Sequence, residues 1–422
     1  MLVLAGLLAP AGAVEVPTSV PGPEDRVSAP ALAVLEGTVV VGWWEGADRG
    51  VRPVCLAGDV SRRGLVDVVG PLRPEGSLPV AVYSVAPMVP WRARAGVREF
   101  LWAVPSRSDE LTVCVLSVVT RGSERFLQLQ TLNLYQAYPV RIRSGSGFPT
   151  CAMVGIDGRR VLVVYRDGDE LRARVLVYVK DEGLGREVWK WLAEGTSPWT
   201  LTLESGVSGE LELRAVVVGV GGERCAVVSV RDSGRGVTRL LVLRLGDRPE
   251  VVARFNLPGN LGPPAVPEVS VSGPPARIPV VCVGPGGELV AYALRFDGRG
   301  WRLEGPFRLG VRVPAWVRPV VVRVPDGFAA IVGGSALSAV VFGFQGGGVR
   351  VRYRVSLARG GTFYRPAAVS LFRGGRYLGT VVACYVRRGV GVGLWLNLVK
   401  IRRPRRLPVA VPVVPVRRRL RR

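Results

Sequence analysis

The stretch Phe148–Lys180 decides the fold. It reads FPTCAMVGIDGRRVLVVYRDGDELRARVLVYVK. Three short runs rich in β-branched residues are separated by turns at Asp157-Gly158 and at Arg166–Asp169. Asp-Gly between such runs is typical of tight turns that join antiparallel strands. The stretch therefore predicts a meander of three strands.

Variants of this unit recur along the chain at intervals of roughly 50 residues. A proline announces the first strand of six units, and one further unit begins near Glu210 without a proline. These prolines are Pro30, Pro87, Pro149, Pro267, Pro319 and Pro366. Four-stranded repeats of this length are typical of β-propellers, in which each blade buries its faces against its neighbours. We therefore predict an all-β, seven-bladed β-propeller of four-stranded antiparallel blades. Tandem β-sandwiches are the alternative, because a strand count alone does not prove closure.

Two details of this fold stay open. The fourth strand is weak in the first and third units, where Glu187–Leu192 fits either a strand or a helical turn. The strand that closes the ring is also undecided, and the candidates are Leu2–Leu8 and the proline-broken Leu407–Val416.

The third unit resembles a blade of the sialidase-like and related non-WD propellers. The resemblance is carried by F-P-T-C-x-x-V-x-x-D-G-x-x-V-L-V-V-Y-R-D-G-D-x-L and by the blade rhythm from Pro30 to about Lys400. The Asp-box of sialidases (Ser-x-Asp-x-Gly-x-x-Trp) is missing from every unit, and so are the Gly-His and Trp-Asp marks of WD40 blades. The resemblance therefore implies the fold and no activity.

The chain is strongly basic, with 57 Lys and Arg against 33 Asp and Glu and a formal net charge of +24. Almost all of the positive charge is arginine. This balance predicts an anionic partner such as nucleic acid, acidic glycan or lipid headgroups. The alternative is that a GC-rich genome and a thermophile's surface charge favour arginine without any ligand.

Several classes of chemistry are excluded or disfavoured by the residues present. The chain has no histidine, which excludes a Ser-His-Asp triad, a Cys-His pair and a His-ligated zinc. No two of the six cysteines form a C-x-x-C pair, and each lies in an apolar run where we expect a small buried hydrophobe, although disulfides stay open. No phosphate-binding loop is present. We therefore expect neither a metal nor a cofactor.

The two ends differ in composition from the rest. Residues 1–28 read as a signal-like segment, with Ala11-Gly12-Ala13 as a cleavage site, followed by a proline-containing linker from Val14 to Ser28. An edge strand is the alternative for the apolar start. Residues 29–400 are the expected propeller, and residues 401–422 are an arginine-rich tail. We expect an extracellular or cell-surface protein, with a cytoplasmic location as the alternative, and no run reaches the ~18 apolar residues of a membrane-spanning helix.

The tail is a candidate polyanion-binding segment for acidic lipid or nucleic acid, since its charge is not balanced by any acid. A disordered, solvated end is the alternative. Its arginines are Arg402, Arg403, Arg405, Arg406, Arg417, Arg418, Arg419, Arg421 and Arg422.

Candidate ligand-binding residues follow from the propeller geometry. The turns between second and third strands, and the links that enter first strands, emerge on one face around the central channel. Arginine beside an aromatic ring at such a place suits anion and sugar recognition. These residues are Trp44, Arg166, Arg231, Trp316, Arg318, Tyr364, Arg365 and Arg387. Ordinary turn chemistry and packing between blades are the alternatives.

The leading functional hypothesis is a non-enzymatic binding or interaction scaffold that recognises a protein, a glycan or another polyanion on this face. A carboxylate-based glycan hydrolase or lyase is one alternative, and it would need two carboxylates about 5–10 Å apart. The candidates for that pair are Glu45, Asp167, Asp169 and Asp232. A nucleic-acid-associated scaffold held by the basic tail is the other alternative.

Overall fold

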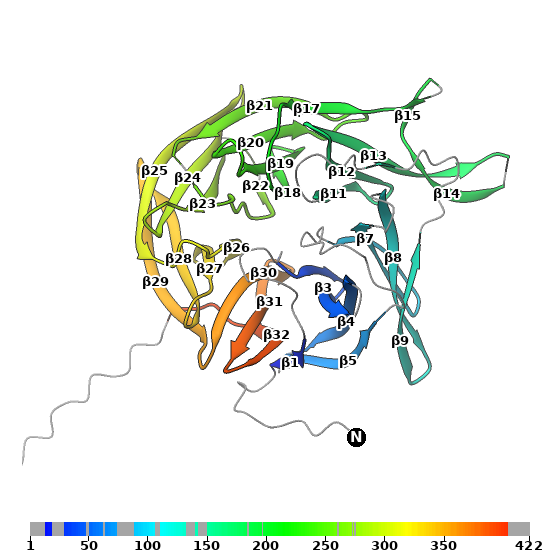
Figure 1. The fold of residues 1–422 in the computed structure, drawn as a ribbon, viewed down its shortest axis with the longest axis horizontal. Coiled ribbons are helices and arrows are strands. Elements are labelled where there is room, and N and C mark those ends of the chain that lie inside the picture. The colour runs from blue at the N-terminus through cyan, green and yellow to red at the C-terminus, as the bar shows by residue number, and fades with distance from the viewer. Residues whose placement is uncertain are drawn as a thin grey trace, which may run out of the picture.

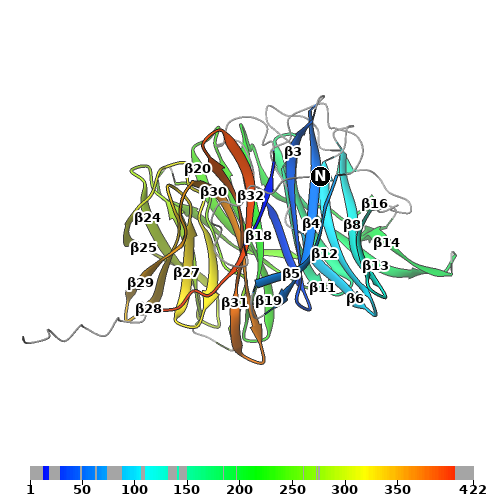
Figure 2. The same cartoon turned by 90° about the horizontal axis from the view of Figure 1, so that it is seen from below.

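The computed structural model describes residues 13–18, 29–47, 50–61, 64–73, 88–105, 110–131, 140–141, 150–183, 185–195, 197–259, 261–271, 273 and 276–403. Every regular element in these residues is a β-strand, and seven sheets stand in a ring (Figure 1). Seen from the side, the strands run between the two faces of the ring (Figure 2). None of the described residues forms a helix that could cross a membrane.

The blades follow one another in chain order, with the first strand innermost except in the fourth and fifth blades. The first is β2 (Ala31–Leu35), β3 (Thr38–Ala47), β4 (Gly50–Ser61) and β5 (Gly64–Leu72). The second is β6 (Val89–Arg94), β7 (Val97–Pro105), β8 (Glu110–Arg121) and β9 (Glu124–Thr131), with β10 (Val140–Arg141) beside β8. The third is β11 (Cys151–Asp157), β12 (Arg160–Asp167), β13 (Glu170–Asp181) and β14 (Arg186–Trp191), with β17 (Leu201–Ser205) beside β13. The short β15 (Ala193–Glu194) and β16 (Ser197–Pro198) form a separate hairpin.

The remaining blades keep the same order. The fourth is β18 (Leu211–Val220), β19 (Glu223–Asp232), β20 (Val237–Arg244) and β21 (Glu250–Leu257). The fifth is β23 (Ala276–Val283), β24 (Glu288–Phe296) and β25 (Trp301–Arg312). The sixth is β26 (Val320–Val324), β27 (Gly327–Val332), β28 (Leu337–Gln345) and β29 (Gly348–Ala358). The seventh contains β30 (Thr362–Arg373), β31 (Arg376–Arg388) and β32 (Gly391–Val399).

Closure of the ring follows from the apolar runs. Both faces of the second strands are covered, so strands such as β12 and β19 contain continuous buried apolar runs, and the core lies between neighbouring blades. Inner strands touch from blade to blade, and the seventh blade touches the first through β30 and β2. The predicted seven-bladed propeller is confirmed, and the sandwich alternative is wrong. Glu187–Leu192 lies mostly in strand β14, so the helical alternative there is wrong too.

The fifth blade departs from the expected pattern at its inner edge. The strand expected after Pro267 is β22 (Val269–Val271), and it pairs in parallel with β18 of the fourth blade. The inner edge of the fifth blade is instead taken by the segment before it, where Ala265 exchanges backbone hydrogen bonds with Val281 at 2.8 and 2.9 Å. The chain thus binds the fourth blade after it has already begun the fifth.

The ring is closed by a strand from the N-terminal region. β1 (Val14–Pro17) pairs antiparallel with β32 and supplies the outer strand of the seventh blade (Figure 1). Arg388 donates to both carboxylate oxygens of Glu15 at 3.2 Å, and Trp43 of the first blade donates to the Thr18 hydroxyl at 3.1 Å. The segment expected to be a linker therefore begins with the closing strand. The two earlier candidates, Leu2–Leu8 and Leu407–Val416, lie outside the described residues.

All six cysteines are buried thiols, and no disulfide joins them. Burial raises the pKa of the Cys55 and Cys151 thiols to about 12, so both stay protonated at neutral pH. They act as the small hydrophobes that the sequence predicted.

Many arginines of the body join one blade to the next. Arg125 of the second blade donates to both oxygens of Asp59 in the first blade, at 2.8 and 2.9 Å. Arg224 and Arg254 of the fourth blade donate to backbone carbonyls of the third. Arg354 of the sixth blade donates to the Gly310 carbonyl of the fifth at 2.6 Å. Part of the positive charge therefore stabilises the ring, because a guanidinium can fork onto two acceptors across a blade boundary.

Arg125→Gln should lower the free energy of unfolding by about 1–3 kcal/mol, since the charge-assisted pair with Asp59 and the bond to the Asp67 carbonyl are both lost. Arg125→Lys should restore only part of this, because an ammonium cannot fork. Urea unfolding measures both. The control is Arg244→Gln, which removes an exposed pair with Glu250 inside one blade and should cost little. Equal losses for Arg125→Gln and Arg244→Gln would contradict the bridging role.

Candidate functional site

Charged side chains from three blades meet where the inner strands begin. Glu212 is the second residue of β18 in the fourth blade, Arg318 precedes β26 of the sixth, and Arg365 lies on β30 of the seventh. Each inner strand starts at the same face of the ring, which we call the entry face. The fourth and seventh blades are not neighbours, so a contact between Glu212 and Arg365 spans the centre of the ring.

The Glu212 carboxylate is held by three guanidinium groups. Arg318 donates from Nε to Oε2 and from Nη2 to Oε1, both at 3.0 Å. Arg365 donates from Nη1 to Oε2 at 3.3 Å. Arg231, at the end of β19, places Nη1 3.8 Å from Oε1. A fork from Arg318 and two flanking cations form a complete carboxylate-binding arrangement, and Glu212 occupies it.

A fourth arginine adds to the positive charge. Arg214 lies two residues after Glu212, on the same side of β18, and its Nη1 donates to the Pro319 carbonyl at 2.7 Å. We call Glu212, Arg214, Arg231, Arg318 and Arg365 the axial arginine cluster. Four guanidinium groups around one carboxylate leave this cluster with an excess of three positive charges.

The pKa values of the cluster reflect that excess. Burial raises the pKa of Glu212, but Arg318 and Arg365 lower it by more. The carboxyl group therefore stays ionised at pH values below the usual pKa of a glutamate. Burial lowers the pKa of Arg214 to about 10, and repulsion from Arg365 and Arg318 adds to this effect. The pKa of Arg231 is likewise lowered by burial and, to a lesser extent, by Arg318. The cluster therefore has a positive potential.

Solvent reaches the cluster on one side. Protein surrounds most of Glu212, yet 33% of its side chain and 20% of the Arg231 side chain stay exposed. Arg318 and Arg365 are almost fully covered, at 10% and 7%. Glu212 and Arg231 therefore form the solvent-facing side of the cluster, and Arg318 and Arg365 form its covered side.

Three of the eight predicted ligand-binding residues, Arg231, Arg318 and Arg365, come together in this cluster. Trp316 packs between blades and is half-buried. Tyr364 is buried, and its ring stacks on Tyr385 at 5.6 Å, so it belongs to the core rather than to the surface.

The other predicted ligand-binding residues lie elsewhere. Arg387 is exposed at the end of β31, and the Trp44 side chain lies outside the described part of the chain. Arg166 is buried, and it donates to the carbonyls of Gly168 and Gly209. It fixes the link that enters β18, which positions Glu212.

Three of the four predicted catalytic carboxylates, those of Glu45, Asp167 and Asp232, make local structural contacts. Glu45, in the first blade, accepts from Arg73 at 2.8 Å. Asp167 pairs with Arg172, and Asp232 accepts from the backbone N–H groups of Ser208 and Arg235 at 2.9 and 3.1 Å. Asp169 accepts the Val207 N–H at its carbonyl. Asp232, Asp169 and Arg166 thus fix the same link before β18, Asp232 through its carboxylate and Asp169 through its backbone carbonyl.

Sequence reasoning missed Glu212 and Arg214. A signal for them was present, because Leu211–Ala215 alternates charged and apolar residues inside a strand predicted to be innermost. Successive side chains of a strand point to opposite sides. Because the apolar side chains of this strand are covered on one side, its charged side chains lie on the other side, toward the channel. The other inner strands lack such an alternating Glu and Arg.

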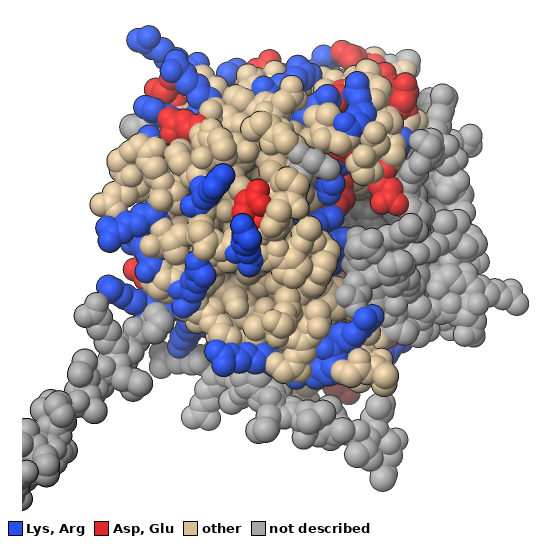
Figure 3. Space-filling view, turned by 60° about the vertical axis from the view of Figure 1, so that its left-hand side comes forward, with Lys and Arg blue, Asp and Glu red and all other residues tan. Residues whose placement is uncertain are grey.

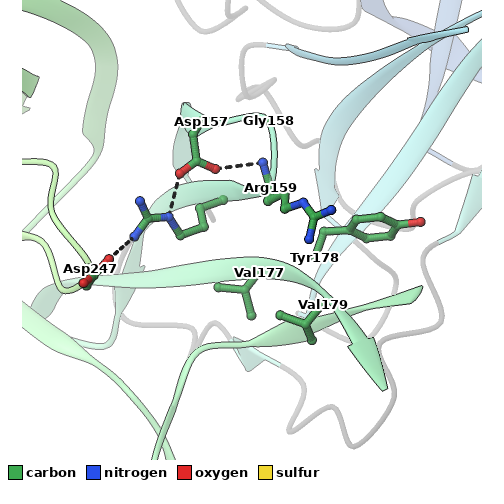
Figure 4. Close-up of a pocket in the computed structure, with 8 residues that line it drawn as sticks. Asp157, Gly158, Arg159, Val177, Tyr178, Val179 and Asp247 are labelled. Atoms are coloured by element: carbon green, nitrogen blue, oxygen red, sulfur yellow. Dashed lines mark hydrogen bonds and ion pairs between the residues drawn. The ribbon is translucent and has the colours of Figure 1, made fainter. Parts of the chain in front are cut away.

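A hollow of 460 Å³ lies on the opposite face, between the third and fourth blades. Arg160 donates to Asp157 and to Asp247 at 2.7 and 2.9 Å. Figure 4 shows these two carboxylates, with the Tyr178 ring to one side. Burial raises the pKa of Asp157, but hydrogen bonds from the Arg159 N–H and from Arg160 lower it by more, so the pKa lies below its usual value. The charges around Arg160 neutralise one another, so this hollow lacks the positive excess of the axial arginine cluster.

The structure describes only the start of the C-terminal tail. Arg402 and Arg403 are exposed, and the remaining tail arginines lie outside the described residues. Ile401 is fully buried, and its N–H donates to the Tyr377 hydroxyl at 3.3 Å, so the tail proper begins after it. No group of three or more Cys, Asp or Glu that could hold a metal occurs among the described residues.

Comparisons find similarity at the level of fold. No protein-family model and no curated protein match the sequence. Among solved structures, the SapL1 lectin in complex with α-methyl fucoside is 14% identical, with a TM-score of 0.41 over 78% of this chain and 97% of that one. The Aleuria aurantia lectin, a six-bladed propeller with a fucose recognition mode, is 13% identical, with a TM-score of 0.41 over 77% and 97%.

The Trypanosoma rangeli sialidase in complex with the inhibitor DANA is 11% identical, with a TM-score of 0.39. The match covers 75% of this chain and 55% of the sialidase, so this chain spans about half of that enzyme. These likenesses concern the propeller fold, and no site residue is carried over from them.

Proposed function

We propose that this propeller is a non-enzymatic binding protein that takes the carboxylate of an acidic glycan at the axial arginine cluster. The observation that carries the proposal is the arrangement of four guanidinium groups from the fourth, sixth and seventh blades around one carboxylate. Arginine forks match carboxylate geometry and are weakly hydrated, so they bind such groups well at a partly covered site.

A binding role is favoured over catalysis because three of the four candidate carboxylates are committed to structure. A glycosidase needs two carboxylates free to exchange a proton or to attack. Glu45, Asp167 and Asp232 instead neutralise arginines or hold backbone N–H groups. Glu212, whose pKa is lowered by Arg318 and Arg365, is a poor general acid at neutral pH.

Glucuronate and glucose test the proposal, since they differ only by the carboxylate. Calorimetric titration of the full chain with a glucuronate-containing disaccharide should show binding, and the glucose counterpart should bind at least ten times more weakly. Arg231→Gln should weaken glucuronate binding about tenfold. Glu212→Gln should strengthen it, because this substitution removes the anion that already occupies the site.

Two controls complete this experiment. Arg186→Gln changes an exposed arginine on the rim of the third blade and should leave glucuronate binding unchanged. Removal of residues 404–422 takes away tail charge without touching Ile401, and should also preserve binding. Equal binding of glucose and glucuronate, or loss of binding on removal of the tail, would overturn the proposal. The second result would instead favour recognition by the basic tail.

A further inference from the structure

The outer strands of the blades form the rim of the ring, and positive charge is unevenly distributed among them. The outer strands β1, β5, β9, β14 and β21 carry four basic and five acidic residues together. β25 and β29 carry six basic residues and one acidic residue. We call these six arginines the rim patch, and they are Arg302, Arg308, Arg312, Arg350, Arg352 and Arg354.

The six arginines lie on two adjacent outer strands. β25 and β29 are the outer strands of neighbouring blades and contact each other. Figure 3 brings this side of the ring forward and shows Lys and Arg side chains spread across it, with fewer Asp and Glu among them. All six rim-patch side chains are exposed. The rim patch is thus available to a partner from solution.

Few acids neutralise the rim patch. Glu304, the one acid on these two strands, pairs with Arg277 and Arg295. Arg302 lies 3.5 Å from Asp297, while Arg350 and Arg354 donate to the Gln345 side chain and the Gly310 carbonyl. Among the described residues, no carboxylate lies within ion-pair distance of Arg308, Arg312, Arg350, Arg352 or Arg354. The patch therefore keeps most of its charge.

Two structural explanations do not account for this concentration. A genome that favours arginine would enrich all seven outer strands alike, and five of them show no excess. Charged side chains on edge strands also discourage edge-to-edge pairing between molecules, but the outer strands of the other five blades face the same risk without such a row. A local excess on two adjacent strands indicates a binding surface.

We propose that the rim patch binds a sulfated or carboxylated polysaccharide as a second, independent site. Arg350, Arg352 and Arg354 are all exposed on one strand, in which Arg352 lies at a β-bulge, and a row of closely spaced cations suits a chain with repeated charges. Single-stranded nucleic acid is less well matched because its binding sites offer exposed rings for base stacking. The rings of Trp301, Phe307 and Tyr353 on these strands are only partly exposed, and the Tyr353 hydroxyl is committed to Asp326 at 2.7 Å.

The test compares two triple substitutions in the full chain that change net charge equally. Arg350, Arg352 and Arg354 are replaced by Gln in one variant, and Arg186, Arg373 and Arg376, which are exposed on other blades, in its control. Heparin serves as the probe. At about 0.15 M salt we expect at least a tenfold loss of affinity in the patch variant and less than threefold in the control. The plot of log affinity against log salt concentration should become less steep, by about two units of slope, in the patch variant alone.

Three further arms make each outcome decisive. The triple substitution of Arg302, Arg308 and Arg312 by Gln tests the same surface from the neighbouring blade and should also weaken heparin binding. Single-stranded DNA and vesicles of anionic lipid serve as competing partners. Equal losses in patch and control variants overturn the proposal, and so does a larger patch-specific loss for DNA or vesicles than for heparin. Glucuronate binding at the axial arginine cluster should persist in the patch variant, so failure here is distinguishable from failure of the proposed function.

Discussion

Removal of residues 1–18 should open the ring and lower the free energy of unfolding by about 3–6 kcal/mol. Val14 and Val16 pack against the core between the seventh and first blades, and their loss costs about 1–2 kcal/mol each. The buried Trp43 N–H would lose its acceptor on Thr18, at a cost of about 1–3 kcal/mol. The pair between Arg388 and Glu15 would be lost as well. Urea unfolding followed by tryptophan fluorescence measures the sum.

The matched control for this deletion is removal of residues 1–12 alone, which leaves β1 and its register with β32 intact. This shorter deletion should unfold at the same urea concentration as the full chain. The chain that lacks residues 1–18 should also self-associate, because β32 becomes an unpaired edge strand with apolar side chains beside it. Identical stability of the two truncated chains would show that β1 does not close the propeller.

The repeat was predictable because its signal is local and redundant. Turn residues such as Asp157-Gly158 and apolar runs such as Val161–Tyr165 repeat along the chain, so an error in one unit does not change the number of blades. The closing strand was not predictable in this way. β1 is four residues long and contains a proline, and only its pairing with β32, far away in sequence, distinguishes it from a linker.

The candidate site was predictable in part for a related reason. Arg231, Arg318 and Arg365 were found because propeller geometry dictates which turns share a face. Glu212 lies inside a strand, and its role depends on arginines 106 and 153 residues away. The inner edge of the fifth blade was predicted wrongly for the same kind of reason. Whether Ala265 or Val269 lies there depends on pairing with other strands, which the local sequence does not specify.

Glu212→Gln should destabilise the folded protein at neutral pH by about 2–4 kcal/mol. Removing one partner of a covered ion pair leaves the others uncompensated, and here Arg214, Arg231, Arg318 and Arg365 would repel one another without a carboxylate between them. Solvent reaches a third of the Glu212 side chain and keeps the expected cost below that of a fully buried pair. The matched control is Glu194→Gln, which breaks an exposed pair with Arg248 and should cost less than about 1 kcal/mol.

The pH dependence separates this charge effect from a loss of packing. The pKa of Glu212 is lowered in the folded protein, since Arg318 and Arg365 outweigh the opposing effect of burial. Its contribution to stability is therefore present above the ordinary glutamate pKa, about 4.3, and is lost as the pH falls through the folded value. The gap in unfolding free energy between the full chain and Glu212→Gln should shrink as the pH falls below about 4. A gap that stays constant between pH 7 and pH 3 would mean that Glu212 acts through its shape, and that the axial arginine cluster does not depend on a central negative charge.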